Sequence, residues 1–439
     1  MINLRLHLEK LLVFAAGLLL ALPLNSKEPN GNDRYWVKLA AGTRQERTAI
    51  ANMGVAIEQT DPGFVSGTCD PKTLAEIKRR KLPLLQATPL DLFLQDFPPE
   101  DGVYHNFSEM ELELKALAQQ YPQFISLFSI GASVEGRPIY ALRFNNSAKG
   151  EAVDQKPGVV FTGTHHAREH LSAEIPLLLA QYLAQNYNNP SFQSIFENRD
   201  IYIIPMVNPD GAEHDIAGGS YQMWRKNRRD NGRGVFGVDL NRNYGFKWNH
   251  GGSSDNPSSD VYMGPAPFSE PETQAIKNFI ERQPKIENGK KSKIRTLITF
   301  HTFSELILYP WGHRYEPIEN ARDLAVFEKM AKTMAAWNGY TPEQSSELYI
   351  ASGDTTDWAY GERGIFAFTF ELTPKSMFDG GFYPGPGVIA STFQANLQPS
   401  LYLIAVADDP YKVLNNPSAA LTGPGRLGAK PKTVTAAGF

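Results

Sequence analysis

The chain has 439 residues, of which 42% are hydrophobic and 21% charged, a composition typical of a globular protein with a sizeable core. Its 43 Lys and Arg residues and 47 Asp and Glu residues give a formal net charge of -4, so it carries no positive excess for binding nucleic-acid phosphates. The single cysteine, Cys69, excludes an intramolecular disulfide and a cysteine-rich metal cage.

Residues 1–26 have the pattern of a signal peptide. Arg5 and Lys10 come first, and an apolar run follows over residues 11–24, which is short for a membrane span but suits a signal sequence. Ser26 is a small residue at a candidate cleavage site, and the alternative is an uncleaved anchor. Export without disulfides favours a bacterial protein. We therefore expect an exported protein, periplasmic or extracellular.

Residues 34–90 are expected to form a small α+β domain. Thr43 and Glu46 have the spacing of a helix-capping box. Strand patterns fall at residues 35–39, 55–57 and 83–88, and helix patterns at residues 46–53 and 73–80. A Pro-rich linker over residues 91–103 follows and marks a domain boundary.

The sequence pattern of residues 104–412 predicts a larger α/β domain. Helix patterns fall at residues 107–121, 171–187, 270–282 and 321–337, and strand patterns at residues 139–144, 158–162, 201–207, 296–300 and 365–372. This alternation predicts a largely parallel or mixed sheet. Residues 413–439 contain Lys and Arg but no acids, with scattered Gly, Ala and Pro, and are expected to be a flexible tail.

A histidine-rich segment directly follows one of the strand patterns. Residues 165–170 hold three of the nine histidines and one glutamate, and His301 directly follows another strand pattern. Imidazole and carboxylate groups both bind zinc, and a catalytic zinc takes three protein ligands plus water. We expect His166, Glu169 and His301 to bind one zinc ion.

A second ligand set competes with this one. His166, Glu169 and His170 also fit the H-x-x-E-H motif of inverted zinc proteases, in which both histidines bind metal and the glutamate is the base. That motif lies within an established helix. Here a buried strand and Gly163 come immediately before it, so a helix can only be starting. This favours the first set, with His165 and His170 as neighbours.

Further motifs follow in an order that resembles the zinc carboxypeptidases of the A/B family. They are Asn208-Pro209-Asp210-Gly211, Trp224-Arg225, Asp239-Leu240-Asn241-Arg242-Asn243, His301-Thr302-Phe303-Ser304, Leu308-Tyr309-Pro310-Trp311-Gly312, Tyr349-Ile350-Ala351-Ser352-Gly353 with Asp357-Trp358, and Phe368-Thr369-Phe370-Glu371-Leu372. The similarity spans about residues 104–408. It implies a three-layer α/β/α fold with a mixed, largely parallel central sheet.

The resemblance also implies a substrate site. Arg242, assisted by Asn241 and Tyr349, would bind the C-terminal carboxylate of a peptide, since guanidinium binds carboxylate in a bidentate manner. Arg225 would polarise the scissile carbonyl and stabilise its oxyanion. Arg168 lies inside the His166–Glu169 motif and is expected to contact substrate as well.

Glu371 lies in an apolar strand pattern, where an unpaired carboxylate is costly. Taken alone, it fits a buried ion pair as well as a functional group. The resemblance implies that it is the general base, which takes a proton from water and passes it to the leaving amine. It also implies that Asp239 orients His166 through the second ring nitrogen.

Substrate preference depends on two further positions. Thr356 matches the floor of the specificity pocket, and Asp354 would attract Lys or Arg if it faces that pocket, or else it caps a turn. We expect a broad preference for hydrophobic C-terminal residues with some tolerance for basic ones. Where the family commonly has Arg, Trp and Tyr, this chain has Gln222, His170 and Phe303.

The expected activity is a zinc-dependent exopeptidase that hydrolyses the last peptide bond of peptides and proteins, with one Zn²⁺ per catalytic domain. Residues 34–90 resemble, in the order of their elements, a ferredoxin-like pro-segment, which would act as an intramolecular inhibitor or chaperone of a zymogen; the alternative is a stable accessory domain. We expect a monomer with no nucleic-acid partner and no membrane association beyond the signal peptide.

Three alternatives remain open at this point. The first alternative is a zinc hydrolase of the same fold that acts on cell-wall peptides or on another amide bond. Another is the H-x-x-E-H endopeptidase. The third is an inactive binding module, which would require the loss of a metal ligand or the base. All four of these residues are present, namely His166, Glu169, His301 and Glu371.

Overall fold

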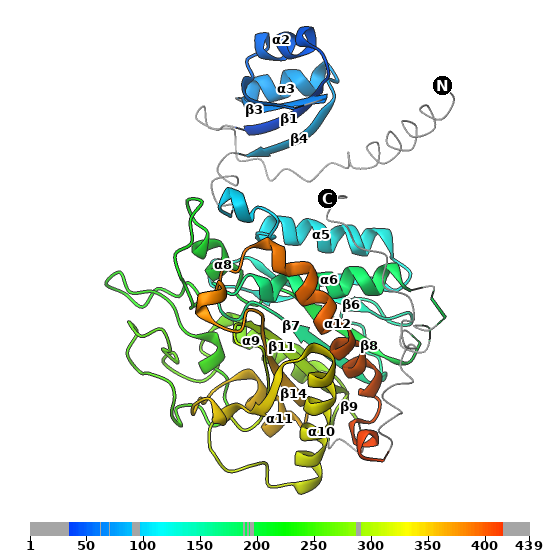
Figure 1. The fold of residues 1–439 in the computed structure, drawn as a ribbon, viewed down its shortest axis with the longest axis vertical. Coiled ribbons are helices and arrows are strands. Elements are labelled where there is room, and N and C mark those ends of the chain that lie inside the picture. The colour runs from blue at the N-terminus through cyan, green and yellow to red at the C-terminus, as the bar shows by residue number, and fades with distance from the viewer. Residues whose placement is uncertain are drawn as a thin grey trace. The chain divides into compact units, whose positions relative to one another are not determined.

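The computed structural model describes residues 35–61, 63–69, 71–89, 97–187, 189–190, 193, 197–286 and 291–415 (Figure 1). The chain divides into one unit that ends at Leu94 and a second that begins at Gln95. The expected signal peptide and residues 416–439 of the expected tail lie outside the described residues. Among the described residues, no helix is long and apolar enough to cross a membrane.

The smaller unit is a four-stranded antiparallel sheet with two helices. It comprises β1 (Tyr35–Ala41), α2 (Arg44–Asn52), β2 (Ala56–Asp61), β3 (Gly63–Cys69), α3 (Pro71–Arg79) and β4 (Leu84–Pro89), and its strand order is β2-β3-β1-β4. Thr43 and Glu46 form the predicted capping box at the start of α2. This succession of elements is ferredoxin-like, and β3 is the one element that the sequence patterns did not predict.

The larger unit contains an eight-stranded mixed sheet of order β13-β12-β14-β11-β7-β8-β6-β5. The strands are β5 (Ile125–Ala132), β6 (Pro138–Phe144), β7 (Gly158–Thr162), β8 (Asp200–Ile204), β11 (Ile294–Thr302), β12 (Leu306–Tyr309), β13 (Thr341–Gln344) and β14 (Phe366–Leu372), and a separate pair joins β9 (Lys285–Ile286) to β10 (Lys291–Ser292). The centre, β14-β11-β7-β8, is parallel. Antiparallel partners flank it, since β12 pairs with β14, β6 with β8, and β5 with β6.

Helices cover both faces of this sheet (Figure 1). Side chains of α5 (Phe107–Gln120), α6 (Leu171–Gln185), α10 (Ala321–Asn338) and α12 (Ile389–Val406) form one core cluster, and those of α9 (Pro271–Arg282) and α11 (Thr355–Arg363) form a second. Successive residues of β14 alternate between them, because Phe366 and Phe368 lie in the first cluster and Ala367 in the second. The predicted three-layer α/β/α fold is therefore confirmed.

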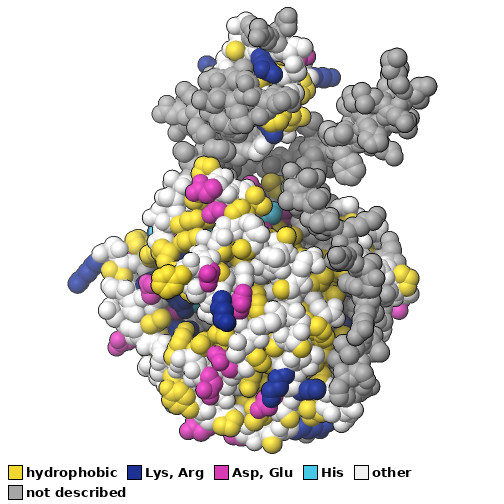
Figure 2. Space-filling model, viewed as in Figure 1, with side chains coloured by type: hydrophobic (Ala, Val, Ile, Leu, Met, Phe, Trp, Pro, Cys, Tyr) yellow, Lys and Arg dark blue, Asp and Glu magenta, His cyan; other side chains and the backbone are white. Residues whose placement is uncertain are grey.

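The described surface of the larger unit mixes side-chain types. On the face in Figure 2, acidic, basic and hydrophobic side chains are interspersed. Near the C-terminal limit of the described residues, Val413 of the short helix η6 (Pro410–Leu414) is buried in the first core cluster.

The strand register brings the candidate residues together. In the parallel pair of β11 and β14, His301 is opposite Glu371. Both residues are in phase with Ala367 and lie on the α9 and α11 face of the sheet. The carboxyl ends of β7, β11 and β14 thus meet at one edge, which is where parallel α/β sheets place their ligand sites.

Candidate active site

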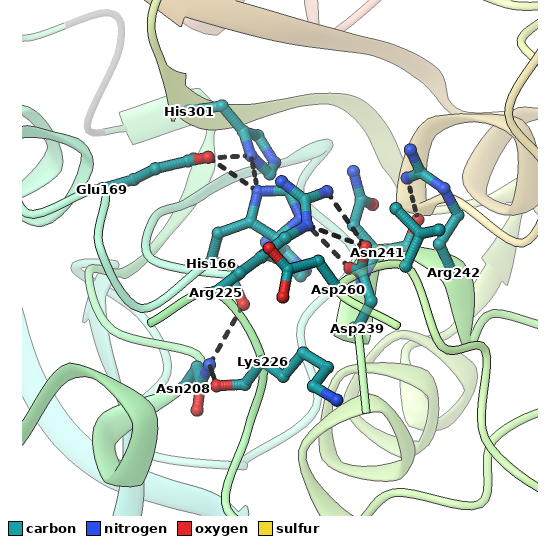
Figure 3. Close-up of polar contacts among 12 residues, drawn as sticks. His166, Glu169, Asn208, Arg225, Lys226, Asp239, Asn241, Arg242, Asp260 and His301 are labelled. Atoms are coloured by element: carbon teal, nitrogen blue, oxygen red, sulfur yellow. Dashed lines mark hydrogen bonds and ion pairs between the residues drawn. The ribbon is translucent and has the colours of Figure 1, made fainter. Parts of the chain in front are cut away.

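Three buried side chains from two strand ends converge on one point (Figure 3). His166 Nδ1 lies 2.8 Å from Glu169 Oε1, and His301 Nδ1 lies 2.9 Å from Glu169 Oε2. The two Nδ1 atoms are 3.1 Å apart. These three residues form the group of described residues whose ligand atoms all lie within 4.8 Å of one another, as a shared metal ion requires.

The remaining ring nitrogens are held from outside the cluster. His166 Nε2 lies 3.1 Å from Asp239 Oδ1, and His301 Nε2 lies 3.2 Å from the hydroxyl of Thr299. These contacts favour protons on both Nε2 atoms, which leaves two Nδ1 lone pairs beside a carboxylate. Two nitrogen lone pairs and an oxygen aimed at one point in a buried site fit a zinc ion.

Asp239 links His166 of this candidate metal site to Arg225 (Figure 3). Its Oδ2 accepts from Arg225 Nε and is also 3.0 Å from Nη2, while its Oδ1 accepts from the backbone of Asn241. Burial raises the pKa of Asp239, but Arg225 and His166 outweigh burial and hold that pKa well below its usual range. The carboxylate is therefore ionised and fixes one edge of the Arg225 guanidinium.

Glu371 is half-buried on β14 beside His301. Among the described residues its carboxylate has no hydrogen-bond partner, in contrast to the buried ion pair considered from sequence. Burial raises the pKa of Glu371 well above its usual range and the Glu169 carboxylate adds to this, while Arg225 and Arg242 oppose it. A bound divalent cation would counter that rise by stabilising the ionised form.

Two polar side chains present free donors nearby. Asn241 Oδ1 accepts from the backbone and hydroxyl of Thr355, at 3.0 and 2.9 Å, which leaves its NH2 group without a partner among the described residues. Arg242 donates through Nε to Gly252 and through Nη1 to the Asn241 carbonyl, so its Nη2 has no acceptor in the described part of the chain. Tyr349 is 57% exposed. This set suits a carboxylate ligand.

Asp354 has two oxygens in different surroundings. Oδ1 caps α11 by accepting from the backbone of Thr356 and Asp357, at 2.9 and 2.8 Å, and from the Thr356 hydroxyl. Oδ2 is buried without a hydrogen-bond partner and would lie 3.1 Å from a Cβ placed on Gly312. One oxygen therefore caps helix α11, whereas the sequence analysis considered the cap of a turn, and the other oxygen is an unsatisfied acceptor.

The other histidines of the motif point elsewhere. His165 contacts the hydroxyls of Tyr244 and Thr299, and His170 Nε2 lies 2.9 Å from Asp215. Because α6 begins only at Leu171, neither ligand of the H-x-x-E-H interpretation lies within a helix. Arg168 donates to the Met223 carbonyl at 3.1 Å, and its guanidinium lies 4.2 Å from the Phe382 ring centre.

Two positioning residues were missed by the sequence analysis. Thr299 contacts His301, and Thr355 orients Asn241. The period of two in a strand places Thr299 on the same face as His301, so this contact had a sequence signal. Thr355 had none, because its contact joins α11 to the short helix η2 (Leu240–Arg242), whose Asn241 is 114 residues away in sequence.

The chain was compared with known proteins. The family described as zinc carboxypeptidase matches residues 110–399. The chain belongs to the zinc carboxypeptidase family. A zinc carboxypeptidase of Saccharothrix mutabilis subsp. capreolus is 36% identical over 396 residues, which cover 86% of this chain and 89% of that relative. Carboxypeptidase A2 of Mus musculus is 30% identical and is matched over 71% of this chain and 72% of its own length.

Solved structures agree with this assignment. Bovine thrombin-activatable fibrinolysis inhibitor, in complex with tick carboxypeptidase inhibitor, matches this zinc carboxypeptidase with a TM-score of 0.59 and 30% identity, over 71% of this chain and 98% of its own. A further structure of thrombin-activatable fibrinolysis inhibitor has a TM-score of 0.62 at 23% identity, over 87% of this chain and 99% of its own, and this likeness supports the fold assignment. The protein is thus a metallocarboxypeptidase, a hydrolase that removes C-terminal residues, and the metal of its family is zinc.

Proposed function

We propose that this zinc carboxypeptidase recognises a free peptide C-terminus through Arg242, Asn241 and Tyr349. The observation that supports this proposal is that Arg242 and Asn241 both keep unpaired donors while their other polar atoms are fixed. A bidentate guanidinium contact fixes the orientation as well as the charge of a carboxylate. Arg168, whose Nη1 lies 3.7 Å from an Asp260 oxygen, is proposed to contact the substrate next to this site.

The proposed chemistry uses Glu371 and Arg225 beside His166, Glu169 and His301. Zinc, when bound, supplies a Lewis acid that lowers the pKa of water and polarises a carbonyl. Glu371 accepts the proton of the attacking water and delivers it to the leaving amine. Arg225, held along one edge by Asp239, donates to the scissile carbonyl oxygen as negative charge develops there.

Side-chain preference is proposed to depend on Asp354 and Thr356. The Thr356 hydroxyl donates to Asp354 Oδ1, so we propose that the Thr356 methyl group is the part available to a substrate side chain. The unpaired Asp354 Oδ2 would provide a site for a cationic side chain. We propose a broad preference for hydrophobic C-terminal residues with tolerance for Lys and Arg. The substrates are peptide and protein C-termini.

The smaller unit is proposed to be a pro-segment. Its ferredoxin-like order of elements and its formation of a compact unit of its own support this role. The protein would then be an exported, monomeric zymogen, periplasmic or extracellular, whose N-terminal unit inhibits or chaperones the catalytic unit.

End-product analysis by mass spectrometry tests the activity. The full chain, before and after limited proteolysis between its two units, is incubated with peptides that differ in the last residue and carry a free or amidated C-terminus. We expect single residues to be lost from the free acids only, and a chelator to stop the reaction. Internal cuts, or equal cleavage of amidated peptides, would contradict the role of Arg242 and favour another amide-bond substrate.

Glu371→Gln tests the base. We expect kcat to fall by about 10²–10⁴-fold, because the glutamine cannot accept a proton, while the zinc content is unchanged. Glu343→Gln is the matched control, since Glu343 is also half-buried in a strand of the same sheet but lies on edge strand β13. Normal kcat in Glu371→Gln would overturn its assignment as the base.

A further inference from the structure

Asp215 is a buried carboxylate to which the proposed reaction assigns no role. It is the last residue of α8 (Pro209–Asp215) and is fully buried. His170 Nε2 lies 2.9 Å from its Oδ2, the backbone of Trp224 donates to its Oδ1 at 2.6 Å, and the Tyr383 hydroxyl lies within 3.1 Å of both oxygens. The carboxylate is thus bound by three separate segments.

Each of these segments carries a residue of the candidate site or a residue that contacts one. His170 directly follows the metal-binding Glu169, and Trp224 directly precedes Arg225. Tyr383 directly follows Phe382, whose ring lies beneath the Arg168 guanidinium. Asp215 therefore connects the metal ligands, the proposed oxyanion donor and a loop next to the substrate site.

The segment that carries Arg225 needs such an anchor. Met223 has φ = 56°, a left-handed conformation that is costly for a residue with a side chain. Besides the Trp224 contact, the backbone of Gln222 donates to the Asp215 carbonyl at 2.8 Å. Asp215 thus binds the chain on both sides of the strained residue.

Aromatic rings pack around this carboxylate. Tyr221 stacks on Tyr383 with ring centres 3.7 Å apart, and Phe97 meets His170 edge to face at 4.7 Å. The Tyr221 hydroxyl donates to Asp101 at 2.5 Å. In a dry environment of this kind hydrogen bonds to a carboxylate are strong, and a lost partner is expensive.

We propose that Asp215 is a positioning residue that, together with His170, sets the place of Arg225 relative to the metal ligands. The proposal rests on the proposed role of Arg225. Removal of the Asp215 carboxylate frees the Trp224 backbone and the Tyr383 hydroxyl, so that residues 221–226 and 380–388 lose their common anchor. The metal ligands themselves do not contact Asp215 and keep their geometry.

The test uses the full chain with Asp215→Ala and Asp215→Asn, and the wild type and all variants undergo the same limited proteolysis between the two units. Asp210→Ala is the matched control, because Asp210 is a buried carboxylate of the same helix whose contacts go to Ser133, Glu135 and Arg137 instead. We expect Asp215→Ala to keep its zinc and to lose about 10- to 100-fold in kcat with KM within about 3-fold, because a displaced Arg225 no longer meets the developing oxyanion in the right place. Asp215→Asn keeps one acceptor and should lose less.

Hydrogen–deuterium exchange gives a readout that does not depend on turnover. We expect faster exchange over residues 221–226 and 380–388 in Asp215→Ala, and over residues 133–137 in the control. Wild-type kcat and exchange in Asp215→Ala, or loss of zinc from it, would overturn the proposal. An inactive wild type would instead refute the proposed function, and the exchange comparison would still test the anchor.

Discussion

At the scale of single residues, Asp354 has one oxygen in a structural role and one that is free for the recognition role proposed above. Its Oδ1 supplies the helix cap that a buried helix start requires, and its Oδ2 has no partner. Burial and the neighbouring Asp357 carboxylate raise the pKa of Asp354 to about 7. The group is therefore neutral in mild acid and becomes an anion as the pH rises through neutrality.

Substrate preference should follow this ionisation. Above pH 7 the charged Asp354 attracts a cationic side chain, and below pH 7 the neutral form does not. We expect the ratio of kcat/KM for C-terminal Lys over Leu to rise by about tenfold between pH 6 and pH 8, equivalent to about 1.4 kcal/mol. Steady-state kinetics on two peptides that differ only in the last residue measure this ratio.

Asp354→Asn is the matching variant, since an asparagine can still cap α11 through its carbonyl oxygen. We expect the Lys-to-Leu ratio in this variant to be low and independent of pH. The use of a ratio removes the titration of Glu371, which affects both substrates equally. A ratio that rises with pH in Asp354→Asn would assign the effect to another group, such as Asp357, whose pKa burial also raises to about 7.

At the scale of elements, one buried charge cluster joins three strands of the sheet. Asp200, the first residue of β8, accepts from Arg143 of β6 through both oxygens and from Lys293, which directly precedes β11. All three side chains are fully buried, and Tyr202 also donates to Asp200. Two buried cations thus share Asp200 as their hydrogen-bonded counter-ion.

Asp200→Asn should be strongly destabilising. It leaves Arg143 and Lys293 buried without the carboxylate to which both are hydrogen-bonded, so we expect a loss of about 3–5 kcal/mol in the free energy of unfolding. Denaturant unfolding measures it. Glu328→Gln is the control, because its ion pair with Lys332 is largely exposed and should contribute no more than about 0.5 kcal/mol. Equal effects of the two variants would refute the role of the cluster.

Sequence patterns predicted these elements unevenly, for physical reasons. The central strands were found because they are buried on both faces and hence continuously apolar, as in β7. Strand β5, at the edge of the sheet, is half-exposed and contains Ser and Gly, so its pattern is weak. The proposed ligands were predicted for a related reason, since they lie at the ends of buried strands, whereas Thr355 and Asp215 act through contacts that depend on how distant segments pack.

At the scale of the whole molecule, the division between the units defines where the catalytic unit begins. The first described residue after the smaller unit, Phe97, is 4% exposed, and Tyr104 is 3% exposed. Both lie in the core cluster that contains α5 and α6. Tyr104 also donates to the Gly385 carbonyl at 3.1 Å. Residues 97–104 are therefore part of the catalytic fold.

This packing limits where maturation can cut the chain. If the smaller unit is a pro-segment, the cut must fall before Phe97, because loss of its ring would remove core contacts and the edge-to-face contact with His170. N-terminal sequencing of the active form should give a first residue at or before 97. Phe97→Ala should cost about 3–5 kcal/mol of stability, whereas Val103→Ala, at a position that is 59% exposed, should cost little. An active form that begins after Tyr104 would show that catalysis does not need residues 97–104. Asp215 would then have to hold residues 221–226 in place without the packing of Phe97 on His170.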